Sequence, residues 1–459
     1  MSSYARISAT IAAFLCMSFG MSAIYVGSLS VFLGPVSASM GWGVSVFTLV
    51  FTVSAYIGAF STPFSGRLID RVGVRIPVTI GVATFALGLF GLSQIHSTGF
   101  VFWASAVCIG IGAALAGPVA HVRVVSSWWD SNRALALGLV VAVAPALSQS
   151  LVAPVARWLI DAFGWRTAYE VLAAAVLVVG CISALFFLKV RSADAATDSP
   201  AAVTPSPAVL EGVPAKRAYR SRTFWTLTAA ECLATSSLIG TQAHMVHWFT
   251  GRGVTGGTAT FLVSLMAVSG MVGVLFSGSL TDRIRSHRVA AVLYTLPAIS
   301  LVLLLAAGDT LWMLGVGVVL MGCALTAVTL LLPYLITRYF GLRASAEIFG
   351  ISLACSMISI GTGPTLIGMG FDTSGSYTLP ISLAVAATTV SALLMFTLKP
   401  YIYAVVKPAP RDGQDAHGHG RDGHTPLRTG GNPLASASRR QPSAITPVAP
   451  PPPGSEGQR

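Results

Sequence analysis

The feature that most constrains this chain is a succession of long apolar segments. Many approach or exceed about 20 residues, the length at which an α-helix crosses about 30 Å of hydrocarbon. In lipid, every backbone N–H and C=O must find its partner within the segment, so apolar segments of this length predict membrane-spanning helices. Only 10% of the 459 residues are charged, whereas a water-soluble globular protein has about a quarter. The sequence therefore predicts an all-α membrane protein.

Twelve transmembrane helices are predicted. They are expected at residues 7–31, 44–64, 76–95, 100–126, 134–157, 166–189, 223–249, 258–279, 288–307, 311–337, 346–369 and 377–399. The first apolar run is longer than the core of a signal peptide, which has about 7–15 residues. Since eleven more spans follow, we expect an uncleaved first helix.

Basic residues are concentrated in alternate loops. One set of loops carries Arg67, Arg71, Arg75, Arg133, Lys189, Arg191, Lys216, Arg217, Arg220, Arg222, Arg283, Arg285, Arg288, Arg338 and Arg343. The other set carries Arg157, Arg166 and Arg252. By the positive-inside rule the first set is cytoplasmic, which predicts both termini in the cytoplasm and a protein of the cell (inner) membrane. The net charge of +12 is thus explained by topology, and no nucleic-acid partner is predicted.

A charged loop occurs twice, about half a chain apart. FSGRLIDRVGVR at 64–75 returns as FSGSLTDRIRSHR at 276–288. Two further pairs repeat at a similar offset: GWGVS at 41–45 with GRGVT at 251–255, and the D-x-x-G turn at 161–164 with that at 372–375. Because the copies share one topology, they predict a parallel repeat of two six-helix halves.

The predicted domains follow from this repeat. They are a six-helix bundle at 1–190, a cytoplasmic linker at 191–222, a second six-helix bundle at 223–400 and a disordered cytoplasmic tail at 401–459. The linker and tail are rich in polar residues and proline and have too little apolar surface to fold alone. Three tail histidines, His417, His419 and His424, have a metal-binding composition, but a solvated tail is the favoured interpretation. No metal, cofactor or disulfide is predicted.

The repeated loops resemble a known motif. Gly66-x-x-x-Asp70-Arg71-x-Gly73-x-Arg75 resembles motif A of the major facilitator superfamily, which joins its helices 2 and 3, and Gly278-x-x-x-Asp282-Arg283 resembles the weaker copy between helices 8 and 9. The resemblance implies the major facilitator fold, with twelve transmembrane helices in two repeats that rock to give alternating access. It also implies that the motif's Asp engages the other half and helps to close the cytoplasmic side. These residues, with Arg133, are the predicted gating residues.

Further motifs resemble one branch of that superfamily. Four motifs are similar to those of the monocarboxylate porters and their oxalate–formate antiporter relatives: Gly41-Trp42, Trp128-Trp129-x-x-x-Arg133-x-Leu135-Ala136-x-Gly138, Gly363-Pro364-x-x-x-Gly368 and Asp372-x-x-Gly375-x-Tyr377. The branch's charged binding residues in helices 1, 8 and 11 have no counterpart here, so they are not carried over. The drug-exporter pattern G-P-x-x-G-G is replaced by Ala144-Pro145-Ala146-Leu147-Ser148, which weakens a drug-efflux interpretation.

Ionisable residues inside the predicted spans are functional candidates, because burying a charge in lipid is costly. The resemblance implies that helices 1, 4, 7 and 10 line a central cavity. Arg123, in helix 4, offers a planar guanidinium that can hold a carboxylate bidentately, and the alternative is snorkelling toward cytoplasmic headgroups. His121 is a second substrate-binding candidate, although such a residue is more often a hydrogen-bonded packing residue.

Helix 7 carries the remaining polar candidates. A medium of low dielectric favours the neutral form of a carboxyl group, so Glu231 is predicted to take up the coupled proton. The alternative is a structural pairing of Glu231 with Arg123 or a backbone group. His244 titrates near physiological pH and can donate to a carboxylate, which makes it a candidate for both coupling and binding. Gln242 adds an amide contact to the predicted binding site.

Tyr25 and Tyr334 complete the predicted binding set, although isolated aromatic residues are more often packing residues. The favoured function is secondary transport of a small organic anion, a monocarboxylate, with protons. The predicted partners are this anion, protons and the lipid bilayer, and the protein is expected to be a monomer. The alternatives are proton-driven efflux of an amphiphilic drug or metabolite and a non-transporting sensor. An enzyme is disfavoured, because no Gly-rich phosphate loop, HExxH or GxSxG element occurs.

Overall fold

The computed structural model describes residues 2–129, 132–188, 212–283, 287–401 and 403. These residues form helices and their connections, with no strand among them apart from one isolated bridge between Gly212 and Gly341. The prediction of an all-α fold is confirmed. One compact unit comprises Met1–Val405. The predicted tail from residue 404 onward, with His417, His419 and His424, lies outside the described residues.

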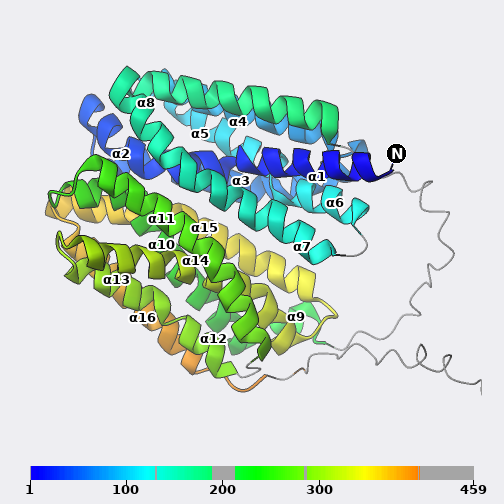
Figure 1. Ribbon diagram of the computed structural model, residues 1–459. Helices are drawn as coiled ribbons and strands as arrows, with labels where there is room; N and C mark the ends of the chain where they lie inside the picture. The colour runs from blue at the N-terminus through cyan, green and yellow to red at the C-terminus, as the bar shows by residue number, and fades with distance from the viewer. Residues whose placement is uncertain (1, 130–131, 189–211, 284–286, 402, 404–459) are drawn as a thin grey trace, which may run out of the picture. The chain divides into compact units, whose positions relative to one another are not determined.

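The first half of this unit precedes the predicted linker (Figure 1). Its elements are α1 (Ser2–Ser18), the π-helix η1 (Ser22–Val26), α2 (Gly27–Met40), α3 (Val44–Val72), α4 (Arg75–Ser93), α5 (Phe100–Leu115), α6 (Pro118–Trp128), α7 (Arg133–Leu137), η2 (Gly138–Val143), α8 (Ala144–Ala175), η3 (Val176–Gly180) and η4 (Ser183–Phe187).

The second half follows the predicted linker. Its elements are α9 (Ala215–Ala218), α10 (Arg222–Thr250), α11 (Gly256–Arg283), α12 (His287–Leu293), α13 (Leu296–Ala306), α14 (Leu311–Phe340), α15 (Ser345–Ser374) and α16 (Thr378–Phe396). The short helix α9 falls within the predicted linker, yet Ala215 and Ala218 are buried against this half. The linker residues 191–211 are not described, so the predicted domain boundaries stay predictions.

Ten helical segments of the described chain are long and apolar enough to cross a membrane. One of them, Leu135–Leu185, covers most of two predicted spans, 134–157 and 166–189. Gly164 interrupts it with a φ of 84°, a backbone conformation that glycine adopts without strain. The predicted span 223–249 corresponds to α10, a helix of 29 residues that is not among the ten, because it carries polar side chains. The number twelve therefore stays a prediction.

The long helices run between two ends of the bundle. We call one end the Asp70 end: α3 and α6 finish there, and α1 begins there. The opposite end, where α2 and α15 finish and α3 begins, is the Asp372 end. In Figure 1 the Asp70 end lies at the right, with the N-terminus, and the Asp372 end lies at the left.

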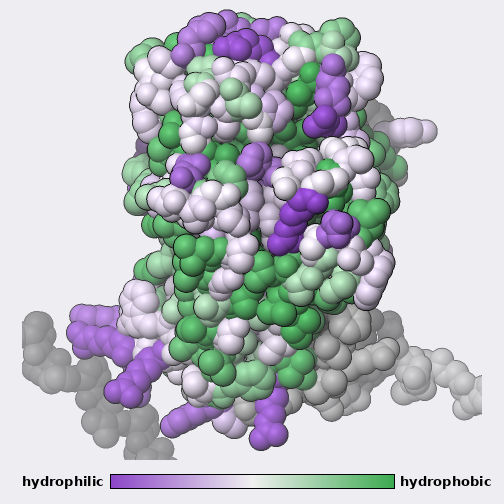
Figure 2. Space-filling model, turned by 90° about the vertical axis from the view of Figure 1, so that its left-hand side faces the viewer, coloured by the Kyte–Doolittle hydropathy of each residue, from purple (hydrophilic) through white to green (hydrophobic). Residues whose placement is uncertain are grey.

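Large apolar side chains are exposed on both halves. Figure 2 shows hydrophobic side chains spread over the lower part of the molecule, where Figure 1 places α13 and α16. Ile299 and Leu383 are exposed on these helices, as are Leu87 and Trp158 in the first half. Apolar surface on this scale is typical of a membrane-facing protein rather than a soluble monomer.

Candidate functional site

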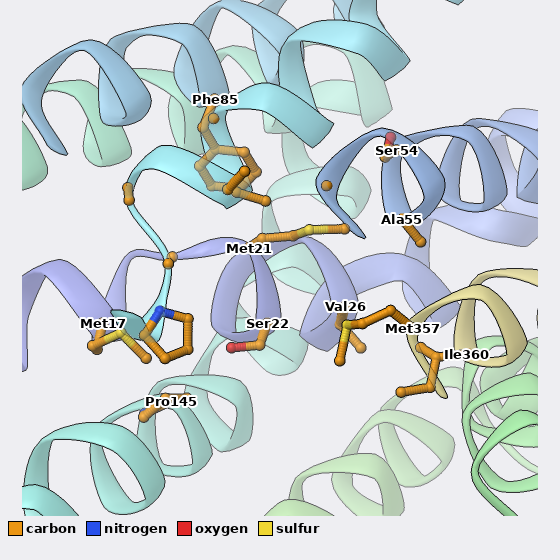
Figure 3. Close-up of a pocket in the computed structure, with 18 of the residues that line it drawn as sticks. Met17, Met21, Ser22, Val26, Ser54, Ala55, Phe85, Pro145, Met357 and Ile360 are labelled. Carbon is orange, nitrogen blue, oxygen red and sulfur yellow. The ribbon is translucent and has the colours of Figure 1, made fainter. Parts of the chain in front are cut away.

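A cavity of about 470 Å³ lies between the two halves. Its walls come from α1, η1, α3, α4, α5, α6, η2 and α8 of the first half and from α10, α14 and α15 of the second. Figure 3 shows Met17, Met21 and Phe85 on one side and Met357 and Ile360 on the other. A volume of this size is typical of sites for small organic molecules.

The cavity walls are strongly apolar. Methionine side chains from both halves contribute, and their flexible thioethers adapt to differently shaped apolar ligands. The described lining residues include no Asp, Glu, Lys, Arg or His side chain. The cavity is therefore built to hold apolar groups, with orientation left to a few neutral polar side chains.

Two helix breaks lie in the cavity wall. Gly20 follows α1 and precedes η1, and Gly117 and Pro118 separate α5 from α6. Pro118 has no N–H to give to the preceding turn, so α5 ends and α6 begins at this point. Irregular backbone at membrane depth is tolerated where it lines a cavity, so the position of these breaks agrees with the position of the cavity.

Four of the five hydroxyl groups on the wall, those other than that of Ser22, are bonded to their own helices. Each donates to the carbonyl four residues earlier: Ser54 to Val50 (2.6 Å), Thr62 to Gly58 (2.7 Å), Thr235 to Glu231 (2.8 Å) and Thr329 to Leu325 (2.9 Å). Helical Ser and Thr side chains often bond in this way. Their donor capacity is therefore already used.

Two glutamines reach the cavity wall. Gln149, from α8, donates from Nε2 to the backbone oxygen of Ser22 at 3.1 Å. Gln242, from α10, is only 2% exposed, and neither its Nε2 nor its Oε1 has a hydrogen-bond partner among the described residues. Of the predicted binding residues, Gln242 is the one that the structure brings to the cavity.

Arg123 lies elsewhere. It sits near the end of α6, and its guanidinium donates to the carboxylate of Asp70 at the end of α3. Both side chains are well exposed, at 43% and 73%. The structure therefore joins a predicted binding residue to a predicted gating residue within the first half, at the Asp70 end.

His121 lies behind the cavity wall. It is fully buried, and its Nδ1 lies 2.9 Å from the carbonyl oxygen of Gly117, which lines the cavity. Because a carbonyl only accepts, Nδ1 carries the proton in the neutral ring. Nε2 has no partner among the described residues.

Glu231 is buried in the second half, where it is 2% exposed. Its Oε2 accepts a hydrogen bond of 2.7 Å from the hydroxyl of Tyr294, which is fully buried after α12. Neither predicted alternative partner, Arg123 or a backbone group, is the one found. Tyr294 carries no sequence pattern that would have singled it out.

His244 belongs to a chain of hydrogen bonds near the Asp372 end. Its Nε2 lies 2.8 Å from the carbonyl oxygen of Pro364, and its Nδ1 lies 3.0 Å from the hydroxyl of Tyr377. His247 Nδ1 lies 2.8 Å from the same hydroxyl. Since the carbonyl only accepts, neutral His244 is protonated at Nε2 and accepts from Tyr377 at Nδ1, and Tyr377 then accepts from His247.

The two predicted tyrosines differ in their surroundings. Tyr25 is fully buried and packs against Phe51, which lines the cavity, and its hydroxyl has no partner among the described residues. Tyr334 lies on α14 toward the Asp70 end, where its ring faces the guanidinium of Arg338 at 5.8 Å. Neither is a lining residue of the cavity as described.

Contacts between the halves gather at the Asp372 end. The Asp372 carboxylate accepts from the backbone N–H groups of Val44 (2.9 Å) and Ser45 (3.0 Å) at the start of α3. Farther along the same two helices, Thr52 donates to the carbonyl oxygen of Gly361 at 2.6 Å. Hydroxyl pairs add to this contact: Thr52 with Thr365 and Tyr56 with Thr362, each at 2.7 Å.

The comparison with known families decides the class of this protein. A family model described as Major Facilitator Superfamily matches residues 10–364 and, in a second match, residues 245–445. The chain belongs to the Major Facilitator Superfamily.

Curated relatives of this superfamily member include transporters from animals and bacteria. Monocarboxylate transporter 13 of Rattus norvegicus is 26% identical over 372 residues, which cover 79% of this chain and 82% of that protein. Monocarboxylate transporter 12-B of Danio rerio is 24% identical over 361 residues, covering 73% and 75%. Uncharacterized transporter YycB of Bacillus subtilis (strain 168) is 23% identical over 340 residues, covering 72% and 79%.

Membership of the superfamily, together with the apolar helices, makes this chain a multi-pass membrane transporter of a small molecule. Its motif A residues lie at the Asp70 end. Gly66 and Arg71 are in α3, Gly73 follows α3 with a φ of 83°, and Arg75 begins α4. Arg133 begins α7, and its Nε donates to Ser126 Oγ at 2.9 Å.

The second copy of the motif falls at the end of α11. Gly278, Asp282 and Arg283 belong to that helix, and their side chains are outside the part of the chain that the structure describes. The structure therefore describes the contact of the motif's aspartate in the first copy, at Asp70, and not in the second. Among the described residues, no group of His, Cys, Asp and Glu side chains is arranged to hold a metal ion.

Proposed function

We propose that this superfamily transporter carries small monocarboxylates together with protons by alternating access. The observation that best supports this proposal is the cavity. Both halves line it, and its apolar wall contains the neutral amide of Gln242, which has no partner among the described residues. The printed names of two relatives, monocarboxylate transporters 13 and 12-B, support the class of substrate.

The contacts between α3 and α15 support alternating access. They join the halves at the Asp372 end, so the described arrangement is a state closed at that end. At the Asp70 end, Asp70 bonds to Arg123 of its own half. The resemblance assigns the motif's Asp to the other half when the cytoplasmic side is closed. We infer that exchanging the Arg123 contact for one with the second half accompanies closure of the Asp70 end.

The alternation of basic loops supports the orientation. It places the Asp70 end and both termini in the cytoplasm and the Asp372 end outside, in the cell membrane. The described contacts of Asp372 with Val44 and Ser45 then lie on the outer side of the membrane. The protein is proposed to work as a monomer, since each half supplies its own share of the cavity wall within one chain.

A proton can accompany the substrate by two routes. It can bind a protein side chain, for which the sequence predicts Glu231 and His244, or it can arrive on the substrate's own carboxyl group. Glu231 is the stronger protein candidate, because its single described partner is the neutral hydroxyl of Tyr294. His244 is already bonded at both ring nitrogens.

The predicted binding role of Arg123 stays a prediction. Its contact with Asp70 and its exposure favour a part in gating, and a substrate on its way to or from the cavity is the anion it would meet. His121, Tyr25 and Tyr334 are proposed to shape the protein around the cavity rather than to bind the substrate directly.

One observation favours a second candidate function. The apolar, methionine-containing wall also suits an amphiphilic drug or metabolite, which proton-driven efflux would remove from the cell.

Transport by purified protein in liposomes separates the two. With the outside more acidic than the lumen, we expect radiolabelled L-lactate to accumulate and an ionophore that collapses the pH gradient to abolish the accumulation. Protein-free liposomes give the background. Absence of lactate counterflow, combined with movement of the amphiphilic dye ethidium, would transfer the assignment to efflux.

A further inference from the structure

The side-chain amide of Gln242 is buried at the wall of the cavity without a partner. Both its donor, Nε2, and its acceptor, Oε1, lack hydrogen bonds among the described residues. A buried polar group without a partner is costly, so such a group in a folded protein needs an explanation. Since Gln242 lines the cavity, a ligand bound there would supply the missing hydrogen-bond partners.

The neighbours of Gln242 do not compete for its amide. Thr235, Ile239 and Gln242 lie at i, i+4 and i+7 and so share the face of α10 that lines the cavity. The Thr235 hydroxyl is bonded within α10, and Gln149 across the cavity is bonded to Ser22.

The ionisable groups of α10 are also engaged elsewhere. Glu231 is bonded to Tyr294, and His244 is bonded to Tyr377 and Pro364. The one titratable side chain among the described lining residues is Cys16, whose thiol lies 3.7 Å from the carbonyl oxygen of Gly180.

We propose that Gln242 binds the substrate's carboxyl group in its protonated, neutral form. The acid O–H donates to Oε1, and Nε2–H donates to the acid's carbonyl oxygen, so both unpartnered atoms are satisfied by one ligand. This inference rests on the proposed function and deepens it: the ligand class is a monocarboxylic acid with an apolar body.

The carboxylate anion does not fit the same group. An ionised carboxylate has acceptors only, so it satisfies Nε2 and leaves Oε1 facing a negative charge. The described lining offers no cation to balance that charge. Burying an unpaired charge is far more costly than burying a neutral acid, so the cavity selects the acid over its anion.

The proton then travels on the substrate. On the acidic side the anion and one proton combine to give the acid, which enters the cavity. On the other side the acid is released and ionises, giving back the anion and the proton. Each cycle moves one anion and one proton in the same direction, so it is electroneutral and requires no titrating protein group in the cavity.

Isothermal titration of the full-length protein in detergent tests this proposal with three probes. Benzoic acid is the monocarboxylic acid, 4-nitrobenzoic acid is a stronger acid of similar shape, and benzamide is the neutral isostere with the same donor–acceptor edge. Above the acid's own pKa, the apparent Kd of benzoic acid should rise about tenfold for each pH unit, because its neutral fraction falls by that factor. Benzamide should bind with a Kd that does not change with pH.

The stronger acid separates titration of the ligand from titration of the protein. At any one pH, 4-nitrobenzoic acid should bind more weakly than benzoic acid by the ratio of their neutral fractions. A protein group that titrates would shift both acids together. Equal Kd values for the two acids at the same pH, a flat profile for benzoic acid, or failure of benzamide to bind would each overturn the proposal.

Substitution of Gln242 is the second test of the proposal. Gln242→Leu should weaken benzoic acid and benzamide binding at least tenfold without lowering the thermal unfolding midpoint, because it removes an unpartnered buried amide. Thr241→Val is the matched control, since Thr241 is buried in the same helix, is not a lining residue of the cavity and has its hydroxyl bonded to Ser237 of α10, and it should change neither Kd by more than about threefold. Unchanged binding in Gln242→Leu would overturn the role of the amide.

Transport of monocarboxylates and the role of Gln242 are tested separately by these measurements. If no monocarboxylate is bound or exchanged at any pH, the proposed function fails. If monocarboxylates are exchanged but bind as anions, the proposed function stands and the assignment of Gln242 falls.

Discussion

The Asp372 carboxylate and the backbone N–H of Val44 form a hydrogen bond of 2.9 Å between the two halves of the transporter. Asp372 lies near the end of α15, and Val44 is the first residue of α3. The residue before α3, Gly43, has no side chain with which to cap its own helix. A helix N-terminus has free N–H donors and a partial positive charge, so Asp372 acts as a capping residue supplied by the opposite half.

Replacing Asp372 by Ala should therefore loosen the Asp372 end. Loss of a capping carboxylate costs about 0.5–2 kcal/mol, which changes an equilibrium about 2- to 30-fold. The measurement is hydrogen–deuterium exchange at the amides of Val44 and Ser45, which should accelerate by a factor in this range.

Asp161→Ala is the matched control for Asp372→Ala. Asp161 occupies the equivalent position of the first repeat, but its Oδ2 accepts from Arg157 Nε at 2.7 Å within the same helix. Its removal should leave exchange at Val44 and Ser45 unchanged. Equal exchange rates in wild type and Asp372→Ala would mean that the cap does not hold the halves together.

A methyl group at Gly43 should also weaken the contact between Asp372 and the start of α3. A Cβ atom there would lie 2.5 Å from Asp372 Oδ2, which is closer than real Cβ contacts permit. Gly43→Ala should accelerate exchange at the start of α3 about as much as Asp372→Ala. The double variant should be no worse than either single one, because both remove one interaction. Additive effects would show that Gly43 acts independently of the cap.

The sequence predicts that the D-x-x-G turn is repeated, but not that Asp161 and Asp372, one in each copy, bind different partners. Asp372 and Gly368 are four residues apart, as are Asp161 and Arg157. A Cβ at Gly368 would lie 2.8 Å from Ser45 Cα, so the glycine lets α15 approach α3 closely enough for Asp372 to cap it. At the equivalent place Arg157 lies against Gly256 at the start of α11 and binds Asp161. Only the packed helices reveal this difference.

Hydropathy was sufficient for the all-α fold and for most of the spans, because lipid imposes length and composition on each helix separately. The candidate site was less predictable. Gln242 was among the predicted residues, yet charge alone would have favoured Arg123, which the structure joins to Asp70. Tyr294 had no distinguishing pattern, and Tyr377, although it belongs to a motif that resembles the monocarboxylate branch, gave no sign of the two histidines that it joins.

The hydroxyl of Tyr377 should contribute measurably to stability. Tyr377→Phe removes the group that joins His244 to His247 and leaves a buried ring nitrogen of His244 without that partner. An unsatisfied buried polar group costs about 1–3 kcal/mol, so the thermal unfolding midpoint in detergent should fall by several degrees.

Tyr25→Phe is the control for the same chemical change. The Tyr25 hydroxyl is buried and has no partner among the described residues, so its removal should leave the midpoint unchanged or raise it. A decrease as large as that in Tyr377→Phe would show that Tyr25 has a partner, such as a buried water.

Glu231→Gln separates the two routes for the coupled proton. If the proton travels on the substrate, this variant should still accumulate radiolabelled L-lactate in liposomes when the outside is more acidic than the lumen. Gln preserves an acceptor for the Tyr294 hydroxyl, so the packing around it should be retained. Exchange of lactate without pH-driven accumulation would instead assign the proton to Glu231.

The pair formed by Asp70 and Arg123 should matter for transport rate more than for binding or stability. Both side chains are exposed, at 73% and 43%, and exposed ion pairs contribute about 0–1 kcal/mol. Arg123→Ala should therefore shift the unfolding midpoint little and leave the Kd of benzoic acid within about threefold, because the cavity is lined by other residues. Lactate counterflow should slow in Arg123→Ala and to a similar extent in Asp70→Ala, since each variant removes the same contact. A loss of benzoic acid binding in Arg123→Ala alone would instead place the guanidinium in the binding site, as its position in helix 4 first suggested.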